Sequence, residues 1–323
     1  MPGARFRQPC DRGSYLPAAC YGLQHGVNVQ WLSVAADQIC RILGKDSNAR
    51  AWHLRAISAR ESLILRVVIN FLRIARRMST LVTGGTKGIG FEIARRLAQP
   101  GSDIFLNFLQ DQQSATRAYH ELIRAGAVPH LIQGDVGTPE GARKIIRAVS
   151  EKVNHIDHII HCAVRVLTAP LLTVDLDAFT QAINLNGTSI VYLVQAAKPL
   201  LRPGSSIIFL SSRGSRTVVP NYAALGAAKA LAEALVRYLV PELAPLGIRI
   251  NCIAPGTVDT EALRQIFQDK TQEYLDREAT QNPSGRNIDH ADYTSVAAFL
   301  ISPAASMIQG QVIFVNGGAY LAP

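Results

Sequence analysis

The sequence predicts a doubly wound α/β fold, with a seven-stranded parallel sheet and helices on both faces. From Met78 onward, short apolar runs alternate with helical patterns, which is typical of consecutive βαβ units. The apolar runs are continuous rather than alternating in polarity, as strands buried on both faces must be. A glycine-rich segment follows the first run and directly precedes a helical pattern, as in a nucleotide-binding sheet.

The expected elements follow one another along the main domain, residues 78–323. The seven strands are expected at 79–83, 103–108, 130–133, 157–161, 205–211, 248–253 and 311–315. The helices are expected at 88–99, 112–125, 138–153, 175–200, 221–244 and 290–301. We find no internal repeat and no low-complexity tract, so the whole segment is predicted to form a single domain.

Residues 1–77 are a basic extension that shows little periodicity before residue 59. Three interpretations are open. The segment is an Arg-rich, acid-poor targeting sequence, a membrane-surface helix over 59–77, or translated sequence upstream of a start at Met78. We favour the last, because the strand pattern begins at once after Met78. The extension is then not part of the functional fold, although targeting to an organelle stays an alternative to a cytoplasmic location.

Composition and charge exclude several classes of function. Residues 1–77 hold 12 Lys and Arg against 4 Asp and Glu, whereas the remaining 246 residues hold 21 against 20. Of the net charge of +9, the extension carries +8 and the main domain +1, so the main domain has no electrostatic footprint for nucleic acid. No apolar run reaches the roughly 20 residues of a transmembrane helix. The five cysteines form no CxxC pair and no metal-ligand spacing, which favours a reducing compartment without disulfides or zinc.

The segment TLVTGGTKGIG, residues 80–90, has the features of a dinucleotide-binding turn. Gly84 permits the tight turn after the strand. Gly88 and Gly90 let the backbone approach a pyrophosphate at the helix N-terminus, where free N–H groups and the helix dipole favour anions.

The phosphate state of the cofactor is predicted from the end of the second strand, DIFLNFLQDQQ. An NAD site usually places an acid there to bind the ribose hydroxyls. Here Asn107 occupies the tip and Asp111 comes later. Lys87, inside the glycine loop, can pair with a 2′-phosphate. The sequence therefore favours NADPH over NADH, with Asp111 as the residue that could reverse this preference.

The chain resembles the short-chain dehydrogenase/reductase family, a Rossmann-type family, over nearly all of 78–323. The matching motifs are TGGTKGIG (83–90), Asp135-Val136, Asn184 in INLNG, Ser211-Ser212, a Tyr/Lys helix, PGTVDT (255–260) and VNGG (315–318). The usual Asn-Asn-Ala-Gly is replaced here by 161–164, of which only Ala163 matches. The resemblance implies a cofactor site formed by Gly84, Thr86, Lys87, Gly88, Ile89, Gly90, Asp135, Val136, Ala163, Lys229, Pro255, Gly256 and Thr260.

The spacing of the Tyr/Lys pair departs from the common family pattern. Four positions before Lys229 stands Leu225, which has no proton to donate, whereas Tyr222 lies seven positions before the lysine. This spacing is similar to that of the enoyl-acyl-carrier-protein reductases of the family, and the ordinary glycine motif is similar to their type III. Seven residues are close to two helical turns, so we expect both side chains on one helix face.

The respaced tyrosine suits reduction of an enoyl thioester. Hydride addition to the β carbon places negative charge on the thioester oxygen, which lies farther from the nicotinamide than a ketone oxygen does. Tyr222 would donate to this enolate oxygen. Lys229 would bind the nicotinamide ribose and lower the pKa of the phenol.

Several further residues have two interpretations. Ser212 is a substrate contact or a strand-end cap, and Asn184 is part of a proton relay or a helix-bending amide. Thr260 is expected to hold the carboxamide of the nicotinamide. His161, Cys162 and Cys252 are interpreted as structural or core residues. The segment 261–280 is expected to be a substrate lid whose apolar side chains line the acyl site, Leu263, Ile266 and Phe267 among them.

The predicted protein is thus an NADPH-dependent enoyl thioester reductase with a substrate on acyl-carrier protein or coenzyme A. The alternatives are a 3-oxoacyl or other ketone reductase, favoured by the ordinary Pro255-Gly256 pair, and a 2,4-dienoyl thioester reductase. From a different class comes a non-catalytic NADP-binding scaffold. The resemblance also implies a homodimer or homotetramer assembled through the helices at 175–200 and 221–244.

Overall fold

The computed structural model describes residues 77–319, so the predictions for residues 1–76 lie outside the described residues. Seven parallel strands form one sheet in the order β3-β2-β1-β4-β5-β6-β7. This confirms the predicted doubly wound architecture. The strands are β1 (Ser79–Thr83), β2 (Asp103–Phe108), β3 (Val128–Gln133), β4 (Ile156–His161), β5 (Leu201–Leu210), β6 (Arg249–Pro255) and β7 (Val312–Val315).

Three strands begin earlier than the apolar pattern predicts: β3, β5 and, by a single residue, β4. β3 starts at Val128 and includes Pro129, which lacks a backbone N–H. It tolerates the proline because it lies at the edge of the sheet, where one side of the strand needs no hydrogen-bond partner. β5 starts at Leu201, which pairs with Ile156 ahead of an irregularity in the register.

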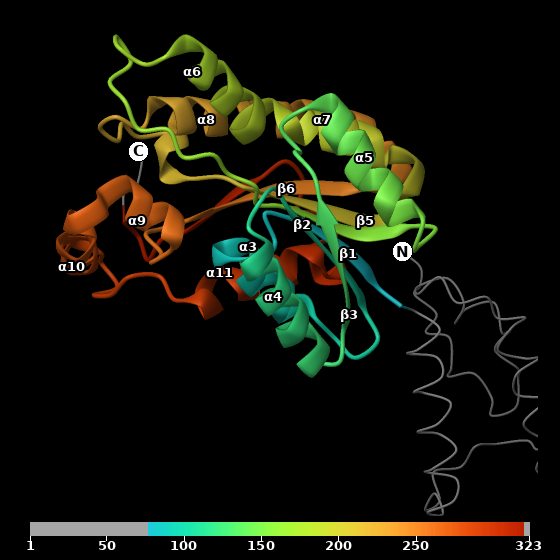
Figure 1. The fold of residues 1–323 in the computed structure, drawn as a ribbon. Coiled ribbons are helices and arrows are strands. Elements are labelled where there is room, and N and C mark those ends of the chain that lie inside the picture. Colours follow the sequence, from blue (N-terminus) through green and yellow to red (C-terminus); the bar gives the residue numbers. More distant parts are fainter. Residues whose placement is uncertain (1–76, 320–323) are drawn as a thin grey trace, which may run out of the picture. The chain divides into compact units, whose positions relative to one another are not determined.

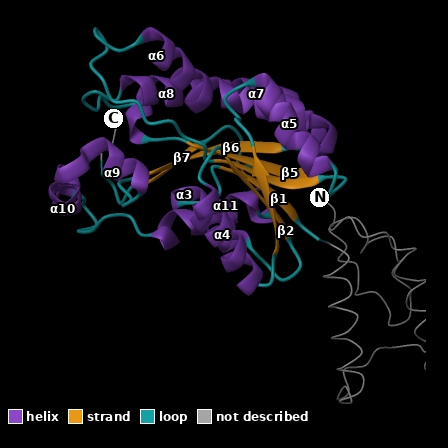
Figure 2. Cartoon of the chain, in the orientation of Figure 1, coloured by secondary structure: helices purple, strands orange, loops and turns teal. Residues whose placement is uncertain are grey.

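Helices cover both faces of the sheet (Figures 1 and 2). One layer holds α5 (Pro139–Ser150), α6 (Leu176–Ile183), α7 (Ser189–Ala197) and α8 (Ala223–Leu243), and the other holds α3 (Gly88–Leu97), α4 (Gln112–Arg124) and α11 (His290–Ile301). Consecutive strand residues face opposite layers. Ile159 and Ile207 pack in the cluster that contains α5, α7 and α8, whereas Ile160 and Ile208 pack against α3 and α11. The sheet is therefore buried on both faces, which explains its continuously apolar strands.

The predicted helix at 175–200 is interrupted. A π-helical turn, Asn184–Thr188, separates α6 from α7. A Cβ atom added at Gly187 within this turn would lie 3.0 Å from the carbonyl oxygen of Ala228, so the turn approaches the backbone of α8 closely. π-turns inside helices frequently mark functional sites.

The predicted helix at 221–244 begins later than expected, because α8 starts at Ala223 and Tyr222 is its N-cap residue. The φ and ψ angles of Tyr222, −105° and 9°, are not helical. Tyr222 therefore lies outside the helix that carries Lys229. The prediction that both side chains share one face of a continuous helix is wrong.

Beyond β6 the chain forms α9 (Glu261–Phe267) and α10 (Thr271–Gln281), where the sequence predicted a lid. A short 3₁₀ turn joins them, and its first residue, Gln268, has a left-handed φ of 49°. Over residues 77–319, no helix is long and apolar enough to cross a membrane. No group of three or more His, Cys, Asp or Glu residues in that range could hold a metal ion.

Candidate active site

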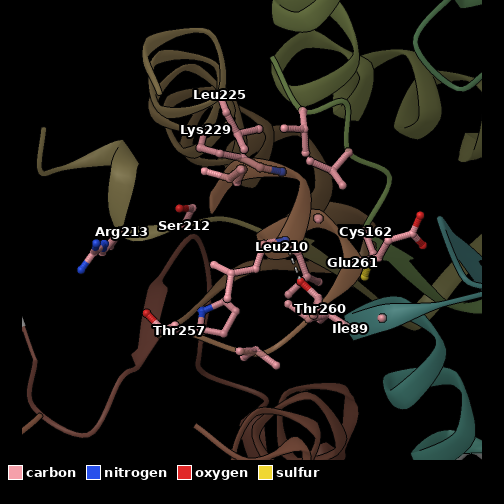
Figure 3. A pocket seen from close by; sticks show the side chains of 18 of the residues that line it. Ile89, Cys162, Leu210, Ser212, Arg213, Leu225, Lys229, Thr257, Thr260 and Glu261 are labelled. Atoms are coloured by element: carbon pink, nitrogen blue, oxygen red, sulfur yellow. Dashed lines mark hydrogen bonds between the residues drawn. The ribbon is translucent and has the colours of Figure 1, made fainter. Parts of the chain in front are cut away.

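A cavity of ≈ 280 Å³ lies beyond the carboxyl ends of β1, β4, β5 and β6. The sheet order places β1 beside β4, so connections leave in opposite directions at this point. Such a switch point is where open α/β sheets bind their ligands. In Figure 3, Ile89, Cys162 and Glu261 lie on one side of the cavity, and Ser212 and Arg213 lie on the other.

The glycine loop has the geometry of a phosphate cradle. Gly84 has a φ of 60°, and an added Cβ atom would lie 2.9 Å from the backbone of Ala163. An added Cβ atom at Gly90 would lie 2.3 Å from the carbonyl oxygen of Gly84. Gly88 has a φ of 55°, and its position faces open space whose nearest atoms, 3.8 Å away, belong to Thr260. A side chain at Gly88 would fill this space.

The helix that follows the loop keeps its N-terminal groups available. α3 begins at Gly88, and no side chain caps it. Its first N–H groups therefore remain free for a pyrophosphate. Together with the open space at Gly88, this shows that the residues present fit the diphosphate of a dinucleotide.

Lys87 lies between two carboxylates. Its Nζ atom is 3.1 Å from Asp111 Oδ2 and 2.7 Å from Glu261 Oε2. All three side chains are substantially exposed, at 45%, 38% and 58% respectively, so these ion pairs are weak and readily exchanged for another anion. Lys87 thus joins the glycine loop to the first residue of α9.

The acids and amides near the end of β2 have structural roles. Asp111 caps α4, and the pKa of its carboxyl group is lowered to about 2, mainly by the backbone N–H and hydroxyl of Ser114 and further by Lys87. The Asn107 amide donates to the carbonyl oxygens of Ile132 and Gly134 at 3.1 and 3.0 Å. The Asp111 carboxylate and the Asn107 amide are thus both engaged in the protein, and neither is placed to bind the hydroxyls of a ribose.

Three of the four predicted catalytic side chains line one cavity. Tyr222, Lys229 and Ser212 all line it, and Leu225 lines it as well. The Ser212 Oγ and Tyr222 Oη atoms are 3.2 Å apart. Burial raises the pKa of Tyr222, and the hydrogen bond to Ser212 partly offsets this, so the phenol keeps its proton at neutral pH.

Lys229 is buried at 4% exposure, with its ammonium 4.3 Å from the centre of the Phe209 ring. Desolvation lowers its pKa to about 8, although the Glu233 carboxylate opposes the shift. A buried cation facing a cavity is a strong candidate for binding polar ligand groups.

The other predicted cofactor residues divide into two groups. Lys87, Ile89, Pro255, Gly256 and Thr260 line the cavity with the loop glycines, and Thr260 also caps α9 through a bond from the Leu263 N–H. The second group does not line the cavity and contains Thr86, Asp135, Val136 and Ala163, and the predicted catalytic residue Asn184 does not line it either.

The residues of the second group and Asn184 have local roles. Val136 is buried in the core, and Asp135 accepts from the Gly137 N–H at 2.8 Å. Asn184 begins the π-turn, where its carbonyl oxygen accepts from the Thr188 hydroxyl at 3.1 Å. Both interpretations of Asn184, as part of a proton relay or as a helix-bending amide, stay predictions. The proposed ligand roles of these residues stay predictions.

His161 lies in a buried hydrogen-bond chain, in line with its structural interpretation. Its ring nitrogens are 2.6 Å from Thr83 Oγ1 and 2.7 Å from Ser189 Oγ, and desolvation, with Lys229, lowers its pKa to about 3. Cys252 is a core residue, and Cys162 packs against the core and also lines the cavity. Burial raises the pKa of the Cys162 thiol, so it stays protonated.

Arg213 and Tyr274 are among the cavity residues that the sequence analysis did not identify. Arg213 follows Ser212 directly, and its Nη2 atom donates to Tyr274 Oη on α10 at 2.6 Å. The Tyr274 ring stacks on Phe267 of α9, with ring centres 3.7 Å apart. The charged composition of 261–280 concealed Tyr274, whereas the predicted lining by Leu263, Ile266 and Phe267 agrees with the cavity.

The fold and the site define a nicotinamide-dependent oxidoreductase: a phosphate cradle, a buried lysine and a tyrosine–serine pair converge on one cavity. The family model described as enoyl-(acyl carrier protein) reductase matches residues 84–320. The chain belongs to this family, within the short-chain dehydrogenases/reductases.

Similar proteins include an enoyl-[acyl-carrier-protein] reductase [NADH] of Synechocystis, 33% identical over 73% of this chain and 94% of that protein. A 1-cyclohexenylcarbonyl-CoA reductase of Streptomyces collinus is 29% identical over 75% of this chain and 87% of that protein. Among solved structures, a short chain dehydrogenase of Burkholderia cenocepacia in complex with NADP has a TM-score of 0.69 at 25% identity, covering 76% of this chain and 98% of that one.

Proposed function

We propose that the protein reduces the trans-2 double bond of an enoyl thioester with NADPH, in fatty-acid or related synthesis. The observation that carries this proposal is the identity of the two cavity residues that precede Lys229. Leu225, at the common spacing, offers no proton, whereas Tyr222, three residues earlier, lines the same cavity and is paired with Ser212. The acid of this site is therefore displaced from its common position.

The bound cofactor supplies the hydride that the β carbon of the substrate receives. Tyr222 then holds its proton at Oη for the enolate oxygen that develops on the thioester. The high pKa of this buried phenol makes it a hydrogen-bond donor rather than a phenolate. Ser212 Oγ, 3.2 Å away, orients the phenol. The Lys229 ammonium adds positive charge to the same wall of the cavity and has room to bind ribose hydroxyls.

The preference for NADPH rests on the surroundings of Lys87. A 2′-phosphate carries more negative charge than one carboxylate, and the exposed pairs with Asp111 and Glu261 are easily displaced. Asp111 caps α4 and Asn107 bonds to the backbone, so neither presents the ribose-binding acid of an NAD site.

The acyl portion of the substrate would lie against the apolar wall formed by Val219, Leu263, Ile266 and Phe267. We propose coenzyme A or acyl-carrier protein as the carrier. We also propose a homodimer or homotetramer assembled through α6, α7 and α8. The exposed side chains of Leu176 and Tyr238, at 74% and 76%, support an interface on these helices.

A ketone reductase is the second candidate, because Ser212 and Tyr222 form a hydroxyl pair that could serve a carbonyl oxygen equally well. The deciding experiment measures NADPH oxidation by the full chain with crotonyl-CoA and with acetoacetyl-CoA. We expect turnover of crotonyl-CoA, and a loss of about 100-fold or more in Tyr222→Phe with unchanged NADPH binding. Tyr119→Phe, in a tyrosine of α4 that does not line the cavity, is the control. Turnover of acetoacetyl-CoA alone would establish the ketone reductase, and silence with both substrates would favour a scaffold.

A further inference from the structure

The short turn that carries Ser212 is held from both sides. Ser212 is the N-cap residue of the 3₁₀ turn Arg213–Ser215, where its hydroxyl accepts from the Gly214 N–H at 3.2 Å. The same oxygen faces Tyr222 Oη. The position of the turn therefore sets the distance between the two hydroxyls.

A buried carboxylate on α8 holds the first side of the turn. Glu233 is 4% exposed, and its Oε1 atom accepts from the Ser211 hydroxyl at 2.5 Å. The Ser215 hydroxyl lies 2.7 Å from the same oxygen and 2.8 Å from the Ser212 carbonyl oxygen. Glu233 thus contacts the residues on either side of Ser212 and Arg213, from one turn beyond Lys229.

A second buried carboxylate, on α10, holds the other side. Glu278 Oε2 accepts from Arg213 Nη1 at 3.0 Å, and the two side chains are 6% and 18% exposed. The same oxygen accepts from the Thr257 hydroxyl at 3.0 Å. Glu278 therefore connects the loops that follow β5 and β6 to one helix.

We propose that Glu233 and Glu278 are positioning residues of the active site, which hold the Ser212 turn in register with Tyr222 from opposite sides. The proposal rests on the proposed roles of Ser212 and Tyr222. The two glutamates differ in what they connect. Glu233 belongs to α8, which also carries Lys229, whereas Glu278 belongs to the α10 part of the predicted lid.

The consequence is that α10 and the Ser212 turn move as one unit. Arg213 contacts α10 twice, through Glu278 and through Tyr274, and the Tyr274 ring stacks on Phe267 in the wall of the cavity. An acyl group that displaces Phe267 also displaces Tyr274 and Arg213, and with Arg213 the adjacent Ser212. Binding of the substrate therefore also aligns the hydroxyl groups of Ser212 and Tyr222.

Hydrogen–deuterium exchange of the full chain, without substrate or cofactor, tests this connection. Glu278→Gln removes the buried carboxylate that Arg213 Nη1 contacts at 3.0 Å. We expect exchange at least about fivefold faster both in the peptide that covers 211–216 and in the peptide that covers 271–281. Glu273→Gln, an exposed glutamate of the same helix, is the control and should change neither.

Glu233→Gln distinguishes the role of Glu233 from that of Glu278. It should accelerate exchange in 211–216 and leave 271–281 unchanged, with the exposed Glu242→Gln of the same helix as its control. Faster exchange confined to 271–281 in Glu278→Gln would overturn the proposal, because α10 would then be independent of the turn. If Glu278→Gln does not fold, Arg213→Lys is the substitute. It keeps the charge but loses the two-pronged contact, and it should accelerate both peptides.

Kinetic measurements then distinguish a role of Glu278 in positioning Ser212 from a role in the stability of the fold alone. With the substrate that the enzyme turns over, Glu278→Gln should lower kcat about tenfold and leave the Kd for NADPH within about twofold. In a Ser212→Ala background the same substitution should cost no more than about twofold, because its effect acts through Ser212. If the loss of kcat in the double variant equals the product of the losses in Glu278→Gln and Ser212→Ala, the proposal is overturned. If no thioester is turned over, the proposed function fails while the exchange experiment still decides this inference.

Discussion

The ammonium nitrogen of Lys229 lies 4.3 Å above the ring of Phe209, inside a helix-covered face of the sheet. Burial of this cation is unfavourable, and the pKa of Lys229 is accordingly lowered from 10.5 to about 8. In the unfolded chain the lysine recovers its ordinary pKa. The lysine thus weakens the fold of the free protein at neutral pH, as functional groups in preorganised sites often do.

Replacing Lys229 by methionine should therefore stabilise the protein without ligand. Below pH 8 both folded and unfolded chains carry the proton, and the cost of burying the charge is fully present. It is relieved as the pH rises from about 8 to 10.5, where the folded state has released the proton and the unfolded state has not. At pH 7 we expect Lys229→Met to raise Tm by roughly 5 °C. Scanning calorimetry measures this, with exposed Lys198→Met as control, and a lowered Tm would contradict it.

The activity of the wild-type enzyme should fall as Lys229 loses its charge. Because the folded pKa is about 8, kcat/KM should decline by about tenfold for each pH unit well above 8. A profile of kcat/KM between pH 6 and 10 tests this. A flat profile up to pH 9.5 would show that the charge of Lys229 does not matter for the reaction.

The surroundings of Lys87 predict the cofactor preference. Lys87→Met should weaken NADPH binding by about tenfold or more and change NADH binding by less than about threefold, because only NADPH offers a 2′-phosphate to pair with it. Glu261→Gln should strengthen NADPH binding slightly, since it removes the anion 2.7 Å from Lys87 Nζ. Fluorescence titration with both cofactors measures the two Kd values. Equal losses for NADPH and NADH in Lys87→Met would refute the assignment.

Moving the phenol from position 222 to position 225 should change whether a thioester enolate oxygen or a ketone oxygen receives the proton. Leu225 lines the cavity four residues before Lys229, so Leu225→Tyr combined with Tyr222→Phe places the only new phenol at the common spacing. We expect the ratio of acetoacetyl-CoA to crotonyl-CoA turnover to rise by about tenfold. Tyr222→Phe alone is the reference. An unchanged ratio would mean that the position of the phenol does not select between the two substrates.

Much of the fold could be predicted because its signals are local. A continuous apolar run indicates a doubly buried strand wherever it lies, and the glycine loop is recognisable because Gly84 and Gly88 adopt positive φ angles that other residues avoid. Tyr222 and Lys229 could be named as candidates because their spacing is similar to that of the family's enoyl reductases. The cavity that both line agrees with this, although the helix-face reasoning behind it was wrong.

Local patterns were insufficient where a helix end or a bend depends on its neighbours. The N-cap conformation of Tyr222 lies outside any periodicity. The π-turn at Asn184 accompanies the close approach of Gly187 to α8, which is a contact between elements rather than a property of one segment.

The residue pattern alone was enough to predict the sheet and to single out the glycine loop and Tyr222 as candidates, because each signal lies in residues close together in the chain. Folding was needed to bring Lys87 to Glu261, and Arg213 to Glu278 across 65 positions. Such pairs form only when packing removes water from side chains that are distant in sequence, and periodicity carries no information about which charges then meet.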